Sequence, residues 1–114
     1  MIQLFTLILA LGGSANAGPY YFTGEEVEIC EEPSEITHIS HLRGSPYFLN
    51  YGGQWPTSYL TIVIWERDIS ALEINPYRYF KGEQFCMKGR ITTYNSMPQL
   101  VIRDPSQLTT NTSN

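Results

Sequence analysis

Two cysteines and two histidines are the residues of this 114-residue chain whose types suggest metal or redox chemistry. Cys30 and Cys86 would form a disulfide in an oxidising compartment, and the alternative is a pair of buried thiols. His38 and His41 would point to opposite faces of a strand, which makes them poor ligands for one metal ion. We therefore expect a disulfide between Cys30 and Cys86 and no histidine metal site.

A run of glutamates is the second group with chemical potential. Residues 18 to 35 hold six glutamates and no base, whereas the later part holds seven bases against five acids, so the net charge of −4 comes from this segment. Carboxylates suit a hard cation such as calcium. Alternating Glu26 and Glu28 are explained more simply by a solvated strand face that discourages edge pairing. We expect no bound metal here.

Catalytic groups do not come together in a recognisable motif. The sequence holds no C-x-x-C, no Ser–His–acid motif and no glycine-rich phosphate loop. A metal-dependent nuclease would need carboxylates clustered with arginines around its metal, and here acids and bases are segregated along the chain. We predict a protein that is not an enzyme, has no catalytic residues and needs no cofactor.

The first residues indicate export. Met1 to Leu11 is an apolar stretch without an acid, and small residues continue to Ala17, which is the pattern of a signal peptide at 1–17 cut before Gly18. The apolar core is shorter than the roughly 20 residues that span a bilayer. We expect a periplasmic or secreted mature chain without a membrane span. The alternative for the first segment is an N-terminal core helix.

Alternation of apolar and polar residues divides the mature chain into strands. The pattern predicts five strands, at residues 26–41 with a bend at Pro33, 47–51, 58–65, 84–94 and 99–103. A short helix at 69–73, capped by Asp68, would join the third strand to the fourth. The residues from 106 onward are polar and lack periodicity, and we predict a disordered tail at 109–114.

Five strands with a short helix between the third and fourth is the order of an OB-fold, a small partly open Greek-key barrel. The sequence therefore predicts an all-β chain with one OB-fold domain at 18–108. Strands 1 and 4 are neighbours in that barrel, which would bring Cys30 and Cys86 within bridging distance. The strand order and the disulfide support each other, although neither requires the other.

Several segments also resemble a known family. They are Phe48-Leu49-Asn50-Tyr51-Gly52, Val63-Ile64-Trp65, residues 82–89 with Cys86, and Pro98 to Ile102 followed by Asp104-Pro105-Ser106-Gln107-Leu108. Together they resemble small exported bacterial OB-fold domains that are described as nucleic-acid-binding-like, and the likeness covers most of residues 25 to 108. The resemblance implies a binding module. The glutamate run departs from the more basic first strand of such domains.

The ligand site follows from the OB-fold geometry, in which strands 2 and 3 and the loops 1–2 and 4–5 bind the ligand. The predicted ligand-binding residues are Arg43, Phe48, Asn50, Tyr59, Thr61, Trp65, Arg90, Tyr94 and Asn95. Aromatic rings would stack on bases for about 1–3 kcal/mol each, and arginines would meet a phosphate or carboxylate as a fork. The alternative is that the aromatics only cover the barrel, because they favour strands.

The sequence thus predicts an exported binding module, with single-stranded nucleic acid or an oligonucleotide as the first ligand class. The alternative is a protein-interaction or envelope structural module that contacts another exported protein without binding nucleic acid. Binding through phosphates needs a basic surface. Convergence of the predicted basic residues on the aromatic face would favour nucleic acid, and their dispersal would count against it; these residues are Arg43, Lys88, Arg90 and Arg103.

Overall fold

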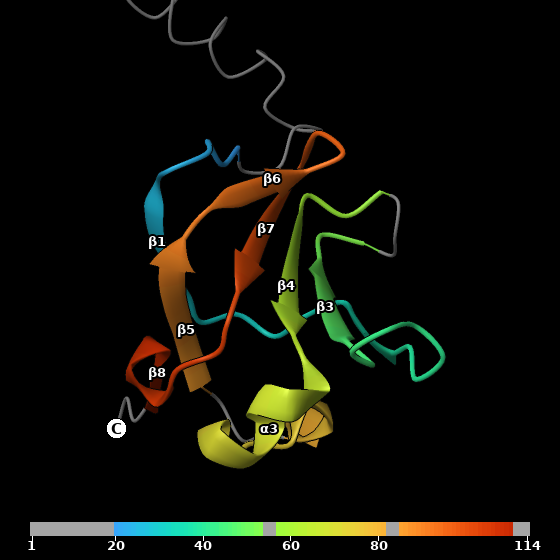
Figure 1. Ribbon diagram of the computed structural model, residues 1–114. Helices are drawn as coiled ribbons and strands as arrows, with labels where there is room; N and C mark the ends of the chain where they lie inside the picture. Colours follow the sequence, from blue (N-terminus) through green and yellow to red (C-terminus); the bar gives the residue numbers. More distant parts are fainter. Residues whose placement is uncertain (1–19, 54–56, 82–84, 111–114) are drawn as a thin grey trace, which may run out of the picture.

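The computed structural model describes residues 20–53, 57–81 and 85–110. The predicted signal peptide at 1–17 and the last residues of the predicted tail, 111–114, lie outside this part of the chain. The described residues form eight strands in two sheets, together with one short α-helix and two 3₁₀-helices (Figure 1). No helix in these ranges has the length and apolar character needed to cross a membrane.

The two sheets differ in size. The three-stranded sheet has the order β1-β5-β8, with β1 (Glu26–Ile29), β5 (Phe85–Arg90) and β8 (Leu108–Thr110). The five-stranded sheet has the order β2-β3-β4-β7-β6, with β2 (Glu35–His38), β3 (Tyr47–Tyr51), β4 (Leu60–Ile64), β7 (Met97–Val101) and β6 (Thr92–Tyr94). β4 and β7 run parallel, and every other pair is antiparallel.

The core lies between the sheets because each strand turns its aliphatic residues to the same side. Leu49 and Tyr51 of β3 and Leu60, Ile62 and Ile64 of β4 are almost fully buried. The predicted aliphatic face of the third strand and the predicted bounds of the second strand are confirmed. The core also takes residues from β1, β5 and β7 and from the helical segment; these are Ile29, Met87, Leu100, Leu72 and Ile74.

Two predicted long strands are each divided between the sheets. The predicted first strand becomes β1 and β2, and the buried Pro33, which has no backbone N–H for a ladder, lies between them. The predicted fourth strand becomes β5 and β6. Ile91 separates them: its side chain enters the core, and its backbone N–H donates to Glu25 O at 2.8 Å. The chain thus passes from one sheet to the other at Ile91, where a buried side chain and a backbone hydrogen bond both hold the residue in place.

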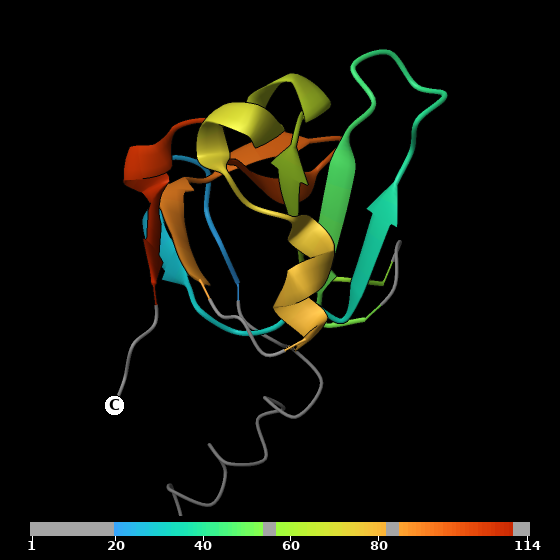
Figure 2. The same cartoon turned by 90° about the horizontal axis from the view of Figure 1, so that it is seen from below.

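The helix begins earlier than predicted. α3 spans Glu66–Leu72, and its N-cap residue Trp65 makes no side-chain capping hydrogen bond. The predicted cap Asp68 is therefore wrong; it lies in the first turn with Glu66, where acidic groups favour the positive end of the helix dipole. A 3₁₀-helix, η1 (Pro76–Lys81), follows, and Figure 2 shows α3 and η1 lying across the end of the molecule between the two sheets.

The C-terminal part is more ordered than the sequence predicts. The last strand of the five-stranded sheet is β7 (Met97–Val101) rather than 99–103, because the turn at Asn95 and Ser96 is tight, with φ of 50° and 67°. Beyond it come η2 (Pro105–Gln107) and β8, which pairs with β5 and extends into the predicted disordered tail. The Asp104 side chain accepts from Ser106 N at 2.9 Å, which starts η2 and directs the chain back to the sheet.

The all-β class is confirmed, whereas a closed five-stranded barrel is not. Two sheets and eight strands are present among the described residues. The difference comes from the division of two long strands and from β8. An alternating pattern marks which face of a strand is buried, but it does not mark the residue at which a strand leaves one sheet for another.

Candidate functional site

A groove of about 430 Å³ lies on the face of the five-stranded sheet opposite the core. Its lining comes from all five strands and the segment after β2; the residues are Glu35, Thr37, Ile39, Phe48, Asn50, Thr61, Tyr94, Met97 and Gln99. Positions 48, 50 and 61 alternate with the core positions of β3 and β4, so the groove runs across the strands on their outer side.

A row of polar side chains crosses the floor of this groove. Glu35, Asn50, Thr61 and Gln99 are successive Cα partners across β2, β3, β4 and β7. Asn50 Nδ2 donates to Glu35 Oε1 at 2.9 Å, and the Thr61 hydroxyl donates to Asn50 Oδ1 at 2.7 Å. Asn50 is only 3% exposed and Thr61 7% exposed. These bonds hold the floor in one arrangement, because breaking one would leave a buried polar atom unpaired.

Apolar and aromatic residues form the walls. Ile39 and Phe48 lie on one side, and Tyr94 and Met97, which are Cα partners, come from the β6–β7 hairpin. The hairpin turns on Asn95 and Ser96, two non-glycine residues with positive φ, as a two-residue turn with right-handed strand twist requires. Tyr94 is 63% exposed, so its ring is accessible from the groove.

Four of the nine predicted ligand-binding residues line the groove, namely Phe48, Asn50, Thr61 and Tyr94. Asn95 follows Tyr94 in the hairpin turn but is not among the lining residues. The sheet thus brings together the predicted residues nearest the middle of strands 2 and 3 and the first residue of the predicted second loop.

The remaining aromatic candidates lie elsewhere. The Trp65 ring covers Gly44 in the β2–β3 loop so closely that a Cβ there would come within 2.7 Å of the indole. The Tyr59 ring lies 6.2 Å from that of Tyr21, and its hydroxyl donates to Glu31 Oε1 at 3.4 Å. Both rings cover the ends of the sheet, which agrees with the alternative that some aromatics serve the fold.

The basic residues do not converge on the groove. Arg90 lies on β5 in the three-stranded sheet, where it pairs with Glu26 at 2.8 Å and donates to Gly24 O at 3.0 Å. Lys88 lies on the same strand, Arg43 in the exposed β2–β3 loop and Arg103 after β7. Among the described lining residues, Glu35 is the one with a formal charge.

Sequence reasoning missed the contribution of β2 and of Gln99 on β7. Glu35, Thr37 and Gln99 line the groove but are not among the predicted ligand-binding residues. The sequence pattern puts Glu35 in the solvated acidic run, and it does not assign the predicted fifth strand to the binding face. The alternation of Glu35, Thr37 and Ile39 was the available signal, since it places all three on one face of a strand.

The acidic run is largely occupied within the fold. Beside the Glu26–Arg90 pair, Glu25 accepts from Phe22 N at 2.9 Å, and Glu28 accepts from the Thr109 hydroxyl at 3.3 Å. Glu31 accepts a hydrogen bond from the Tyr59 hydroxyl, and Glu35 accepts one from the Asn50 amide. Five of the six glutamates therefore have partners in the described part of the chain. The glutamates therefore link the segment around β1 and β2 to neighbouring parts of the fold through these hydrogen bonds and the ion pair.

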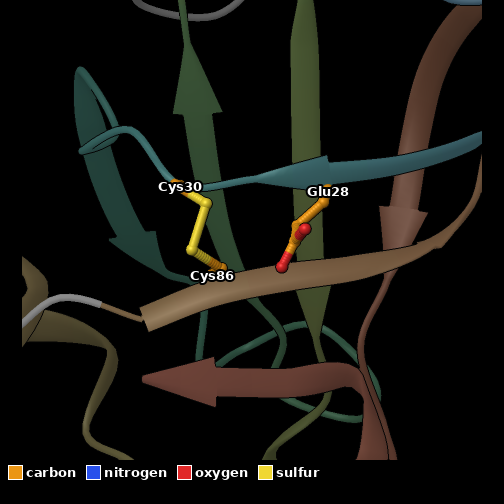
Figure 3. A group of neighbouring side chains, drawn as sticks. All are labelled: Glu28, Cys30 and Cys86. Carbon is orange, nitrogen blue, oxygen red and sulfur yellow. A yellow bond between two sulfur atoms is a disulfide. The ribbon is translucent and has the colours of Figure 1, made fainter. Parts of the chain in front are cut away.

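The predicted disulfide between Cys30 and Cys86 is confirmed. It joins the end of β1 to β5, and the Glu28 carboxylate lies beside it (Figure 3). Candidate ligand atoms of Glu28, Cys30 and Cys86 lie within 4.8 Å of one another. Because the two sulfurs are bonded to each other, they are not the thiolates that a metal would need. This cluster serves as a covalent link between strands.

Three partly buried tyrosines have raised pKa values. Burial raises the pKa of Tyr59, and the Glu31 charge adds to the effect. The pKa of Tyr21 is raised by burial first and then by Glu31 and Glu25. Burial likewise raises the pKa of Tyr47, whose ring stacks on His38 with 4.0 Å between centroids. All three hydroxyls stay protonated at neutral pH.

No family model, curated protein or solved structure matches the chain.

Proposed function

We propose that this chain is an exported, non-enzymatic binding module of the OB-fold type, and that its ligand lies in the groove across the five-stranded sheet. The groove carries the proposal. Its volume of about 430 Å³ falls within the range of small-molecule sites. It combines a fixed polar floor with apolar walls, which is the composition of a surface that orients a ligand and also removes apolar area from water.

The strand pairings support the OB-fold interpretation. If β1 and β2 are halves of one bent strand, and β5 and β6 halves of another, then five strands follow one another as 1-2-3-5-4, with the fourth beside the first. The parallel β4–β7 pair and the antiparallel β1–β5 pair occupy the third–fifth and first–fourth positions of that order. In this interpretation the groove lies where OB-folds bind ligands, on the face of strands 2 and 3.

Export is supported by the disulfide together with the apolar first residues. Disulfides persist in oxidising compartments such as the periplasm and the extracellular space. The Cys30–Cys86 bond spans a sequence separation of 56 residues, so it constrains most of the domain. A periplasmic or secreted location is the one in which this bond would be maintained.

The ligand class follows from charge. Phe48 and Tyr94 would stack on bases, which together with the family resemblance favours single-stranded nucleic acid. Phosphates, however, need arginines or lysines, and the described lining offers the Glu35 carboxylate instead. The geometry therefore favours a ligand that is not a polyanion. The acidic run favours a protein partner less, because five of its carboxylates already have partners.

A groove-filling variant tests the proposed function whichever ligand class binds. Gln99→Trp would place a large ring in the groove, and Thr109→Trp would place one on the exposed face of β8 as the matched control. Both are compared with the wild type on an array of immobilised single-stranded DNA, RNA, neutral oligosaccharides and peptides. We expect the wild type and Thr109→Trp to bind at least one of these ligand classes, and Gln99→Trp to lose binding to that class. A wild type that retains none, or a Gln99→Trp variant that binds like the wild type, would contradict the proposal.

A further inference from the structure

The floor of the groove offers two neutral hydrogen-bonding groups, one on the row of Glu35, Asn50, Thr61 and Gln99 and one beside it. Gln99 provides an amide and Thr37 a hydroxyl, and neither side chain has a hydrogen-bond partner among the residues that the structure describes. Gln99 is the Cα partner of Thr61 and so lies next to the fixed pair of Asn50 and Thr61, whereas Thr37 is the partner of Phe48 and lies two residues from Glu35 on β2. Amides and hydroxyls both donate and accept, so the exposed groups would match a ligand whose own groups also do both.

The walls select flat apolar surfaces. Phe48 and Tyr94 come from different strands, β3 and β6, and bound the groove with Ile39 and Met97. An aromatic ring buries a large apolar area at low entropic cost. A ligand that fits this site therefore carries an apolar face beside a periphery of hydroxyl or amide groups.

Electrostatics decides between two ligands of that description. An oligonucleotide has stacking faces and hydrogen-bonding edges, but it brings phosphates that would face Glu35 across a groove whose described lining lacks lysine and arginine. A neutral oligosaccharide has C–H faces for the rings and hydroxyls for the amides, and it brings no charge. OB-folds accommodate both kinds of oligomer.

We propose that the groove binds a neutral oligosaccharide, with sugar rings against Phe48 and Tyr94 and hydroxyls against Gln99, Thr37 and the edge of Asn50. This inference rests on the proposed function and gives its ligand a chemical class. The Glu35 carboxylate accepts a hydrogen bond from Asn50 and would accept from sugar hydroxyls on the same row. It disfavours a phosphate at the same place.

Calorimetric titration of the mature protein tests the inference. The probes are chitopentaose, cellopentaose and maltopentaose, with a thymidine pentanucleotide of matched length. We expect at least one sugar to bind, with an affinity that stays constant as salt rises, because no counterions are released. The pentanucleotide should bind more weakly than that sugar even at low salt.

Variants locate the bound sugar. Tyr94→Ala should weaken binding about tenfold, since truncation of a tyrosine that packs on the ligand commonly costs this much. Gln99→Ala should also weaken it, whereas Tyr20→Ala, which removes another exposed tyrosine ring that does not line the groove, should bind as the wild type does. Thermal unfolding confirms that each variant is folded. Equal sugar affinity in Tyr94→Ala and the wild type would overturn the inference.

The outcomes separate the two proposals. Binding of the pentanucleotide but of no sugar, with loss in Gln99→Trp, would overturn the oligosaccharide inference and leave the binding groove intact. Sugar binding that survives in Gln99→Trp would overturn both, because the ligand would then lie elsewhere. Absence of binding by all three sugars, while the array retains another class through the groove, would overturn the oligosaccharide inference alone.

Discussion

Asn50 and Thr61 face each other across β3 and β4, and the Thr61 hydroxyl donates a 2.7 Å hydrogen bond to Asn50 Oδ1. Both side chains are buried, at 3% and 7% exposure. The pair lies on the groove side of a sheet whose other side is aliphatic. Since buried polar atoms are costly without partners, this pair fixes the Asn50 amide in the orientation that the groove presents.

Removing this hydrogen bond should destabilise the fold. Thr61→Val keeps the shape of the side chain but leaves Asn50 Oδ1 without its donor, and we expect the free energy of unfolding to fall by about 1–3 kcal/mol. Thr37→Val is the matched control on the neighbouring β2 and should change it by less than about 0.5 kcal/mol. Urea unfolding measures both. Equal losses in the two variants would show that the Thr61 hydroxyl has no special role.

Gln107 links three segments through one amide. Its Oε1 accepts from Arg103 N and Asp104 N at 2.9 and 3.0 Å, and its Nε2 donates to Lys88 O and Val101 O at 3.0 and 3.1 Å. We expect Gln107→Ala to lower the free energy of unfolding by about 1–3 kcal/mol, and Gln99→Ala to leave it nearly unchanged. Chemical denaturation of the two variants side by side is the test, and a Gln99→Ala loss as large as that of Gln107→Ala would refute the prediction.

Gly89 makes room for that amide. A Cβ at this position would lie 2.9 Å from both Gln107 Nε2 and Leu100 Cδ1. Gly89→Ala should therefore force the C-terminal segment away from β5 and cost about 1–3 kcal/mol of stability. Relative to the wild type, amide hydrogen exchange in the variant should be faster in β8 and little changed in β3. If exchange in β8 and the free energy of unfolding both stay at their wild-type values, the Gln107 and Leu100 side chains can move aside without loss of stability, and the prediction is wrong.

The disulfide should contribute strongly to stability. Closing a loop across a separation of 56 residues limits the unfolded chain, and the expected contribution is about 2–4 kcal/mol. Urea unfolding with and without a thiol reductant measures it, with thiol counting to confirm reduction. Coinciding unfolding curves for the oxidised and reduced protein would be inconsistent with this role.

Alkaline titration should reveal the Tyr59–Glu31 contact. The raised pKa means that the folded protein holds the Tyr59 proton more tightly than the unfolded chain does. This contribution to stability is complete below the unfolded value of about 10 and is lost as pH rises through the folded pKa. Glu31→Gln removes the charge, so tyrosinate absorbance should appear at lower pH. The neighbouring Glu32→Gln should titrate like the wild type, and identical curves for all three proteins would contradict the assignment.

The sequence predicted what depends on local periodicity and composition. The β3 strand, the aliphatic face of β4 and the Cys30–Cys86 bond follow from alternation and from the presence of two cysteines in a chain with export features. Placement of β8 could not be predicted, because it depends on the Gln107 amide reaching Lys88 and Val101. Contacts between segments that are distant in the sequence do not appear in the alternation of apolar and polar residues.

Only the part of the groove that depends on strand alternation could be predicted from the sequence. Alternation correctly put Phe48, Asn50 and Thr61 on one face. It also put Trp65 on that face of the third strand, but the ring instead covers Gly44 beyond the end of β4. Where a groove ends depends on which loops rise beside the sheet, and that is a property of the tertiary structure.

The most direct measurement is amide chemical-shift mapping on ¹⁵N-labelled protein, titrated with the oligomer that binds most tightly. We expect the perturbed amides to gather on the groove strands β2, β3, β4, β6 and β7, around Thr37, Asn50, Thr61 and Gln99. Perturbations confined to β1, β5 and β8, on the other sheet, would contradict it.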